Sequence, residues 1–513
     1  RDLVRSRGLG DVYKRQTMSE VKHYKTDPAD AVSIFQKVAY GFGMFCNNLV
    51  PAAMGCMVIV LNLGLKMNPV LIGYIMSLPR IVDAFTDPVM GYVSDNTKSR
   101  FGRRKPYIFV GAIGLGVIFA LMWRIGSGYS EMFYFWFFLF GSNLLFIMNT
   151  VFATPFIAFG YEMTPDYHEK TRVMAWANWL GQIPWILTPW FWWIMANDKF
   201  FDTPVIGAKN LALWVGSAVV ILGTMPALFC RERYKAASNN ELVKPPKLQR
   251  VLKHTVEFFK GFVITFKNTA FLKICIATFF LFNGFMMVAG LGMYVLIFFT
   301  FGGDQVMGGK YNGLFGTTSA LSTVFLVIPF VSMLATKIGK KRAFIVSTLI
   351  SLFGFVMKWW CFNPEYSSKY VIELPFIGEI QYIILLPAIL ISFGIGSLFT
   401  LMGAMMGDTC DLDELNSCKR REGMFGAIYW WTVKLGMSVA FAFSGHILNA
   451  TGFDVELGVN QAAETLFMLR LYDIGVPVFT SIIAVIAMVF YKINEQRSRE
   501  IRTELENRRG KAC

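Results

Sequence analysis

The chain has 513 residues, of which 55% are hydrophobic and only 16% are charged. Soluble proteins carry about a quarter charged residues, so this composition excludes an ordinary soluble domain. The long apolar blocks also exclude a membrane barrel, whose strands alternate over about ten residues. The net charge of +15 lies in short loops between the blocks. In these loops the basic residues set the topology and contact anionic lipid, so we expect no nucleic acid partner.

Residues 1–17 are polar and basic and precede the first methionine, Met18, so we expect a leader foreign to the natural protein. The eight cysteines include no CxxC pair, and the four histidines share no metal-ligand spacing. The sequence contains no HExxH motif and no Ser/His/Asp set that would indicate catalysis. A membrane-embedded enzyme is therefore disfavoured, and no cofactor is expected beyond a coupling ion.

A membrane-spanning helix needs about 20 apolar residues, and the chain contains twelve such blocks. They predict an all-α polytopic membrane protein with twelve transmembrane helices. The predicted spans are residues 34–63, 69–93, 107–126, 132–160, 173–196, 210–230, 271–300, 311–335, 343–361, 381–406, 424–449 and 467–491.

A long polar central loop, residues 231–270, separates two six-helix halves at 18–230 and 271–492, and a basic tail follows at 493–513. Loops after even-numbered blocks are rich in Lys and Arg, whereas loops after odd-numbered blocks are poorer in them. By the positive-inside rule, both termini face the cytoplasm. We therefore expect a multi-pass, monomeric protein of the inner or plasma membrane.

The halves repeat each other weakly on the predicted cytoplasmic side. The sequence Gly102-Arg-Arg-Lys after the second block recurs as Gly339-Lys-Lys-Arg after the eighth. Similarly, Glu162 after the fourth block has a counterpart in Asp408 after the tenth. Two parallel six-helix repeats form the major facilitator arrangement, in which the substrate binds between the halves near mid-membrane.

The second block carries Arg80, Asp83 and Asp87, spaced i, i+3 and i+7 so that they share one helix face. Charges at membrane depth are costly unless they pair or face water, and they commonly mark ion pathways. A salt bridge that only fixes helix packing is the alternative. Because two carboxylates against one arginine leave one carboxylate for a cation, the pattern favours transport.

The chain resembles the glycoside–pentoside–hexuronide:cation symporters, the melibiose-carrier family, over nearly its whole length after Met18. The helix-two segment and the segment after Glu162 together are not expected of a facilitator in general. The resemblance rests on Tyr40-Gly-Phe-Gly, Asp83-Ala-Phe-Thr-Asp-Pro-Val-Met-Gly, Ser99-Arg-Phe-Gly-Arg-Arg-Lys-Pro, Pro155-Phe156, Glu162-Met-Thr-Pro-Asp-Tyr-His-Glu-Lys-Thr-Arg, Asp408-Thr-Cys-Asp411 and Lys434.

The resemblance implies a cation site formed by Asp83 and Asp87, with Thr86 and Thr150 as neutral oxygen ligands and Lys434 nearby. Hard cations prefer oxygen ligands, so the two carboxylates would hold sodium if sodium is the coupling ion. If the ion is a proton, two neighbouring carboxylates cannot both ionise cheaply, and one can be loaded from water.

The sugar side of the site departs from the family, whose members place acids where this chain has Asn48 and Ala153, and an arginine where it has Asn178. Neutral amides can bind hydroxyl groups through paired donors and acceptors, although any one amide could instead join two helices. The predicted substrate-binding residues are Asn47, Asn48, Asn149, Asn178, Gln182, Trp179, Trp430 and Lys434.

Two further sets of residues have predicted structural roles. Trp190, Trp192 and Trp193 lie near a helix end and are predicted to belong to the aromatic belt. Cytoplasmic bases are predicted to pair with acids and to hold the inner ends of the halves together when the site opens outward. The predicted gating residues are Arg103, Arg104, Glu162, Asp408 and Asp411.

The sequence thus predicts a sodium- or proton-coupled secondary symporter that imports a sugar or glycoside by alternating access. Two alternatives stay open. The same fold could carry a lysolipid or another non-sugar solute, or the chain could be a transporter-like sensor that binds without flux.

Overall fold

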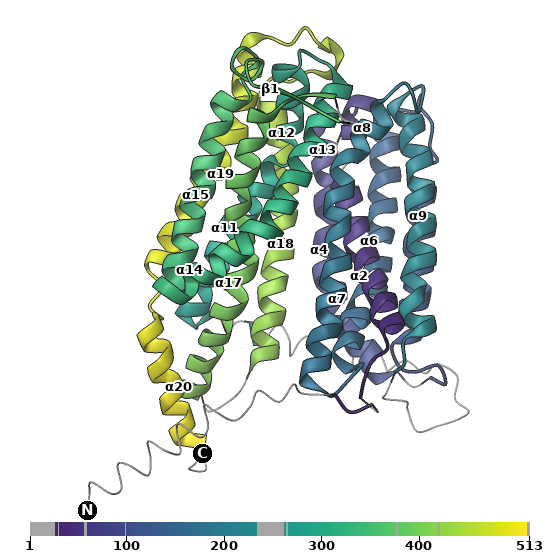
Figure 1. Ribbon diagram of the computed structural model, residues 1–513. Helices are drawn as coiled ribbons and strands as arrows, with labels where there is room; N and C mark the ends of the chain where they lie inside the picture. The colour runs from purple at the N-terminus through teal and green to yellow at the C-terminus, as the bar shows by residue number, and fades with distance from the viewer. Residues whose placement is uncertain are drawn as a thin grey trace, which may run out of the picture.

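The computed structural model describes residues 26–28, 30–55, 59–97, 99–232, 261–262, 265–375, 378–417 and 421–509. Figure 1 shows two groups of long helices side by side, one from each half of the chain. Helix α2 begins and helix α19 ends at the same end of the helix bundle, which we call the terminal face. We call the other end of the bundle the opposite face. The predicted leader and most of the predicted central loop lie outside the described residues.

The first group starts its helices with side-chain caps. Asn68, Ser130, Asp166 and Thr203 each accept a backbone N–H in the first turn of α4, α6, α7 and α9, respectively. The elements are α2 (Ile34–Gly55), the π-helical turn η1 (Val60–Gly64), α4 (Pro69–Asn96), α5 (Lys105–Met122), α6 (Glu131–Glu162), α7 (Tyr167–Leu187), the 3-10 turn η2 (Thr188–Trp190), α8 (Phe191–Ala196) and α9 (Pro204–Phe229).

The second group also consists mainly of long helices, but π-helical and 3-10 turns interrupt more of them. Its elements are α11 (Thr269–Val288), α12 (Leu291–Tyr294), η3 (Val295–Thr300), α13 (Gln305–Ser322), η4 (Thr323–Val327), α14 (Ile328–Ile338), α15 (Lys340–Cys361), α16 (Pro364–Ser367), β1 (Val371–Leu374), β2 (Gly378–Gln381), η5 (Tyr382–Leu385), α17 (Leu386–Ser417), α18 (Glu422–Ala450), η6 (Val455–Leu457), α19 (Ala463–Val489) and α20 (Glu495–Arg509).

Over the described residues, the twelve predicted blocks fall mainly on helical segments. Within the described residues, nine helices are long and apolar enough to cross a membrane. The helices α2, α7 and α18 are not among the nine, because polar residues such as Asn47, Gln182 and Lys434 interrupt their apolar sequence. The fold is therefore a helical multi-pass membrane fold, and the number twelve stays a prediction.

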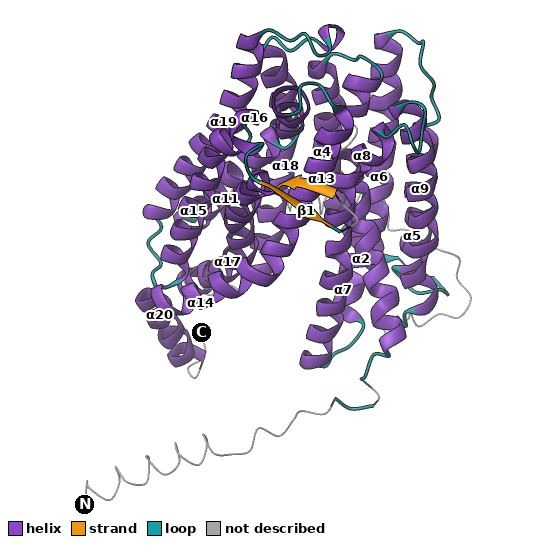
Figure 2. Cartoon of the chain, turned by 45° about the horizontal axis from the view of Figure 1, so that its top comes forward, coloured by secondary structure: helices purple, strands orange, loops and turns teal. Residues whose placement is uncertain are grey.

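A small hairpin between α15 and α17 was not predicted. The strands β1 and β2 pair antiparallel from Val371 with Gln381 to Leu374 with Gly378. The Gln381 N–H donates to the Tyr311 hydroxyl of α13 at 2.6 Å, and Figure 2 shows the hairpin beside α13. The fold is otherwise all-α, and the hairpin ties the loop after α15 to another helix of the same half.

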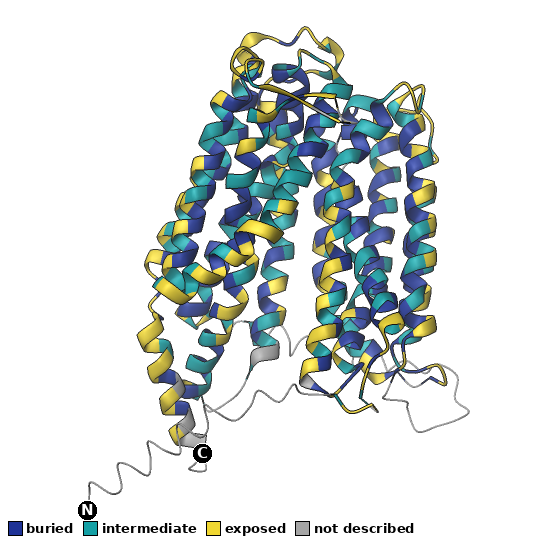
Figure 3. Ribbon diagram, in the orientation of Figure 1, coloured by how far each residue is buried: buried dark blue, intermediate teal, exposed yellow. Residues whose placement is uncertain are grey.

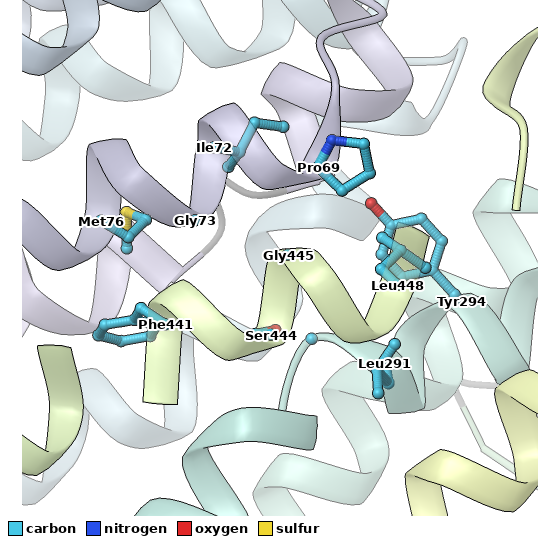
Figure 4. A pocket seen from close by; sticks show the side chains of 11 residues that line it. Pro69, Ile72, Gly73, Met76, Leu291, Tyr294, Phe441, Ser444, Gly445 and Leu448 are labelled. Atoms are coloured by element: carbon cyan, nitrogen blue, oxygen red, sulfur yellow. The ribbon is translucent and has the colours of Figure 1, made fainter. Parts of the chain in front are cut away.

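The two halves meet along α4 and α18, which run antiparallel. A Cβ atom on Gly73 would lie 2.9 Å from the Phe441 carbonyl oxygen, and one on Gly445 would lie 2.2 Å from the Pro69 carbonyl oxygen. Glycine at these positions lets the two backbones touch. Figure 4 shows this crossing, with both glycines beside a small apolar pocket.

This α4–α18 seam, which runs from Pro69 and Gly445 toward the terminal face, continues for about two turns. The Ser438 hydroxyl of α18 donates to the Ser77 carbonyl oxygen of α4 at 2.9 Å. Nearer the terminal face, a Cβ atom on Gly426 of α18 would meet nothing within 4 Å. The ribbons of the halves likewise diverge toward the terminal face in Figures 1 and 2.

A second seam joins α13 to η2 and α8, which follow α7. Cβ atoms on Gly309, Gly313 and Gly316 of α13 would meet Trp193, Trp190 and Pro189 at 3.0, 2.5 and 2.5 Å. The Asn312 side chain also donates to the Pro189 carbonyl oxygen at 3.1 Å. Both seams lie toward the opposite face, so the halves are closed there.

The aromatic-belt prediction is wrong for two of the three tryptophans. Trp192 is only 1% exposed, and the Trp190 indole donates to the Thr317 hydroxyl of α13 at 2.9 Å. The segment η2–α8 faces α13 of the other half at this level. Lipid and a packed protein surface are both apolar, so the sequence does not distinguish them.

Candidate functional site

Two carboxylates of α4, Asp83 and Asp87, face α6 about one turn apart. The Thr150 hydroxyl of α6 lies 2.6 Å from Asp83 Oδ1 and 3.1 Å from Asp87 Oδ1. Thr154, one turn further along α6, donates to Asp87 Oδ1 at 3.2 Å. The Thr86 hydroxyl lies 3.2 Å from that of Thr150. Carboxylate and hydroxyl oxygens therefore converge, as the sequence predicted for Asp83, Asp87, Thr86 and Thr150.

A lysine from the other half completes this acid cluster. Lys434 of α18 pairs with Asp87, and its ammonium lies 2.9 Å from Asp83 Oδ2. Arg80 Nη1 lies 3.9 Å from the same Asp83 oxygen, and its guanidinium stacks 4.2 Å above the Phe146 ring. The cluster thus holds two positive and two negative charges.

This balance corrects the expectation of a carboxylate in excess. The sequence placed only Arg80 on the same helix face as the acids, whereas Lys434 reaches them across the α4–α18 seam. Uncompensated buried charges are expensive, so the bases neutralise the acids here. A further cation must therefore displace a base or add net charge.

The members of the cluster differ in their access to solvent. The Asp83 side chain is 1% exposed, whereas those of Lys434 and Asp87 are 25% and 30% exposed. The cluster also lies where the α4–α18 seam ends, because Ser77 and Gly73 of the seam precede Asp83 on α4. An ion or proton arriving from water would first meet Asp87 and Lys434.

The predicted amides of α2 and α6 differ in their contacts. The Asn48 side chain donates to the Gly181 carbonyl oxygen of α7 at 2.7 Å, which is the helix-joining role left open by the sequence. The Asn47 amide lies 3.8 Å from the Met44 sulfur. Asn149 is buried next to Thr150, and within the described residues its Oδ1 has no hydrogen-bond partner.

The remaining predicted substrate residues lie on α7 and α18. Asn178, Trp179 and Gln182 are exposed on α7, and Trp179 packs edge-on against Trp176 with ring centroids 6.0 Å apart. Trp430 is 52% exposed on α18, one turn before Lys434. The structure brings Lys434 to the acid cluster, so its contacts differ from those of the other predicted substrate residues.

Four of the five predicted gating residues form ion pairs within their own halves. Arg103 pairs with Glu162, and Arg104 lies 3.1 Å from the same carboxylate and 2.5 Å from Asp95. In the second half, Lys340 lies 2.7 Å from Asp408 of α17. Asp411 lies about one turn beyond Asp408 on the same helix. These contacts brace each half separately at the terminal face.

The loop after α4 closes around a buried acid. Glu232 Oε1 accepts the backbone N–H groups of Arg103 and Arg104 at 3.0 and 3.3 Å. Gly102, with φ of +104°, permits this because a Cβ atom there would lie 1.9 Å from Glu232. Burial raises the pKa of the Glu232 carboxyl, and the two N–H bonds oppose that rise.

Sequence reasoning missed Thr154 and a second buried ion pair. Lys358 of α15 pairs with Asp473 of α19, and both side chains are nearly inaccessible. A helical spacing of four from Thr150 could have indicated Thr154. Opposite charges in two separate apolar blocks could have indicated Lys358 and Asp473.

Residues 39–495 match the family model described as MFS/sugar transport protein. The chain belongs to this family. It is thus a multi-pass membrane transporter of the MFS type, and the family and fold are those of transporters rather than enzymes. Members of this class bind a small-molecule substrate within the bilayer.

Curated relatives extend over nearly the whole chain. An uncharacterized symporter, YnaJ of Bacillus subtilis, is 25% identical over 93% of this chain and 96% of its own. The glucuronide carrier protein homolog of Escherichia coli is 22% identical, with coverages of 85% and 87%. The sodium-dependent lysophosphatidylcholine symporter 1-B of Danio rerio is 22% identical, with coverages of 97% and 94%.

A solved structure agrees on the fold. A bacterial homologue of the human lysosomal transporter Spinster superposes with a TM-score of 0.59 at 12% identity, covering 92% of this chain and 99% of that chain. At this identity the likeness concerns the fold alone.

Proposed function

We propose that the protein is a cation-coupled symporter of the inner or plasma membrane that imports a sugar or glycoside by alternating access. One observation carries the proposal: Asp83 and Asp87 of one half meet Lys434 of the other half where the α4–α18 seam ends. A relative described as a symporter supports the coupling to an ion, and one described as a glucuronide carrier homolog supports the substrate class.

In the proposed mechanism, Lys434 neutralises the acids when no ion is bound. A sodium ion would take the oxygens of Asp83, Asp87 and Thr150 in its place, and a proton would neutralise Asp87 directly. Either event releases Lys434 from the other half and weakens the contact between α4 and α18. Ion binding and movement of the halves are thereby coupled, and each changes the free energy of the other.

A lysophospholipid is the second candidate substrate. The Danio rerio relative is described as a sodium-dependent lysophosphatidylcholine symporter, and it matches almost the whole chain. The replaced sugar positions Asn48 and Asn178 do not carry the charges of the sugar carriers. A neutral site of this kind favours the glycoside or the lysolipid over a charged sugar acid.

The test is thermal stabilisation of purified protein by a panel of neutral sugars and glycosides and by lysophosphatidylcholine, in sodium chloride or choline chloride. We expect one neutral sugar or glycoside to stabilise the wild type more in sodium, or more at low pH if the ion is a proton. In proteoliposomes, the wild type should accumulate that sugar against its gradient.

The Asp87→Asn variant should still bind the sugar and exchange it downhill, but it should lose both ion dependence and uphill accumulation. Asp198→Asn, the same change on an exposed loop, is the matched control and should behave as wild type. Intact uphill uptake by Asp87→Asn refutes the ion site. Stabilisation by lysophosphatidylcholine alone selects the second substrate, and binding without flux indicates a sensor.

A further inference from the structure

Basic side chains gather where α19 ends at the terminal face. Lys273 of α11 donates to the Phe490 carbonyl oxygen at 2.6 Å. Lys341 of α15 donates to the carbonyl oxygens of Val489 and Tyr491 at 2.7 and 2.8 Å. Three consecutive carbonyl groups at the end of α19 thus accept hydrogen bonds from two ammonium groups.

Arg342 adds a third positive charge to this group. It follows Lys341 on α15, is exposed, and acts electrostatically on the Lys341 ammonium together with Lys273. Within the described part of the chain, none of the three bases has a carboxylate within 4 Å, whereas the nearby Lys340 pairs with Asp408. We call Lys273, Lys341 and Arg342 the α19-end cluster.

Capping of α19 does not account for all of this charge. The end of a helix carries about half a negative charge, and two ammonium groups already satisfy its last carbonyls. The Arg342 guanidinium makes no contact with those carbonyls that would explain it as a cap. The α19-end cluster therefore carries an excess of positive charge that would attract an anion.

Apolar stripes lead away from the cluster along two neighbouring helices. On α15, Val346, Leu349 and Phe353 are exposed and follow Arg342 at i+4, i+7 and i+11, which is one helix face. On the last part of α19 the exposed large apolar residues are Phe479, Ile482, Ile486 and Val489, and Phe490 follows them. Figures 1 and 3 show α15 and α19 side by side on the outer flank of the second half.

We propose that the α19-end cluster binds the headgroup of an anionic phospholipid, whose acyl chains lie along the apolar stripes of α15 and α19. The arrangement matches both parts of such a lipid. Three bases without a carboxylate partner meet the phosphate at the membrane border, and apolar side chains continue directly into the bilayer. A soluble anion would use the bases alone and would leave the stripes without a role.

The experiment measures lipid binding by detergent-solubilised protein in native mass spectrometry, with phosphatidylglycerol and phosphatidylcholine as probes. We expect the wild type to retain phosphatidylglycerol preferentially. Arg342→Gln should bind it about fivefold more weakly, because each base near a membrane surface contributes on the order of 1 kcal/mol to anionic-lipid binding. Arg342→Lys should keep the preference.

Arg100→Gln is the matched control, since Arg100 is an exposed base at the same face in the other half and lies over the Phe101 ring. It should bind phosphatidylglycerol as the wild type does. Equal losses in Arg342→Gln and Arg100→Gln would show diffuse attraction and overturn the site. Displacement of the lipid by millimolar inorganic phosphate, or equal binding of both lipids, would overturn it as well.

Discussion

On the proposed mechanism, the solvent exposure of single side chains in the acid cluster decides which residue an entering ion meets first. Asp83 is sealed between Thr150, Arg80 and Lys434, whereas Asp87 and Lys434 reach solvent. On the proposed mechanism, Asp87 is therefore the residue that exchanges partners, and Lys434 is the partner that leaves it. Thr150 contacts both acids and can hold the oxygens in place while the lysine moves.

Lys434→Gln should make the protein less stable in choline and more responsive to sodium than the wild type. The change leaves two carboxylates against Arg80 alone and removes a repulsion of about 1–4 kcal/mol for an incoming cation. Sodium-dependent melting curves should show the half-maximal sodium concentration falling by fivefold or more. Lys337→Gln, an exposed base at the end of α14, is the control; a weaker sodium response in Lys434→Gln would argue against displacement.

The Lys358–Asp473 pair makes a separate prediction at this scale. Asp473→Asn leaves the Lys358 ammonium buried without its partner, which costs about 3–5 kcal/mol. The double variant Lys358→Met/Asp473→Leu replaces the pair by apolar side chains and should recover most of that loss. Melting temperatures of the three proteins measure this, and equal stability of Asp473→Asn and wild type would show that the pair is solvated.

At the scale of elements, glycine sets how closely the halves approach. Gly73 and Gly445 bring α4 and α18 into backbone contact, and Gly309, Gly313 and Gly316 let α13 pack closely against Trp193, Trp190 and Pro189. Such contacts replace the hydrophobic effect, which is absent between helices in lipid. The seams therefore depend on a few positions rather than on total apolar area.

Gly445→Ala should open the α4–α18 seam, because its Cβ atom would lie 2.2 Å from the Pro69 carbonyl oxygen. Overpacking of this kind costs about 1–3 kcal/mol. A cysteine placed at Ser444, which lines the pocket of Figure 4, should then react faster with a thiol reagent. Gly426→Ala on the same helix meets nothing within 4 Å and should leave that rate unchanged. An equal rate in both variants would contradict the role of the seam.

At the scale of the molecule, the apolar blocks predicted where the helices lie, and the helix-two acids lie at the centre of the candidate site. The partners of those helices were less predictable. Trp190 and Trp192 meet protein where lipid was expected. Only the family resemblance placed Lys434 near the acids, and the structure adds that it pairs with both of them. An apolar segment indicates that its side chains are shielded from water. It does not indicate whether lipid or protein shields them.

Joining the halves at the opposite face should stop the transport cycle. The Tyr74 hydroxyl of α4 lies 3.2 Å from His446 Nε2 of α18, so Tyr74→Cys/His446→Cys can be linked through two disulfides by a short bis-methanethiosulfonate. Linked protein should lose uptake of the stabilising sugar and regain it on reduction. Phe35→Cys/Phe229→Cys links α2 to α9 within one half, where ring centroids lie 5.2 Å apart, and should leave uptake intact. Continued uptake by the linked Tyr74/His446 pair would contradict alternating access.

The equal numbers of acids and bases around Asp83 have an electrical consequence. With Arg80 and Lys434 facing Asp83 and Asp87, the empty carrier moves no net charge from these four residues. On the proposed mechanism, one bound monovalent ion makes the same region positive, so a membrane potential acts on the loaded step, by about 2.3 kcal/mol per 100 mV for a full crossing. A cell could then draw solute inward on voltage even where the ion concentrations on the two sides are equal.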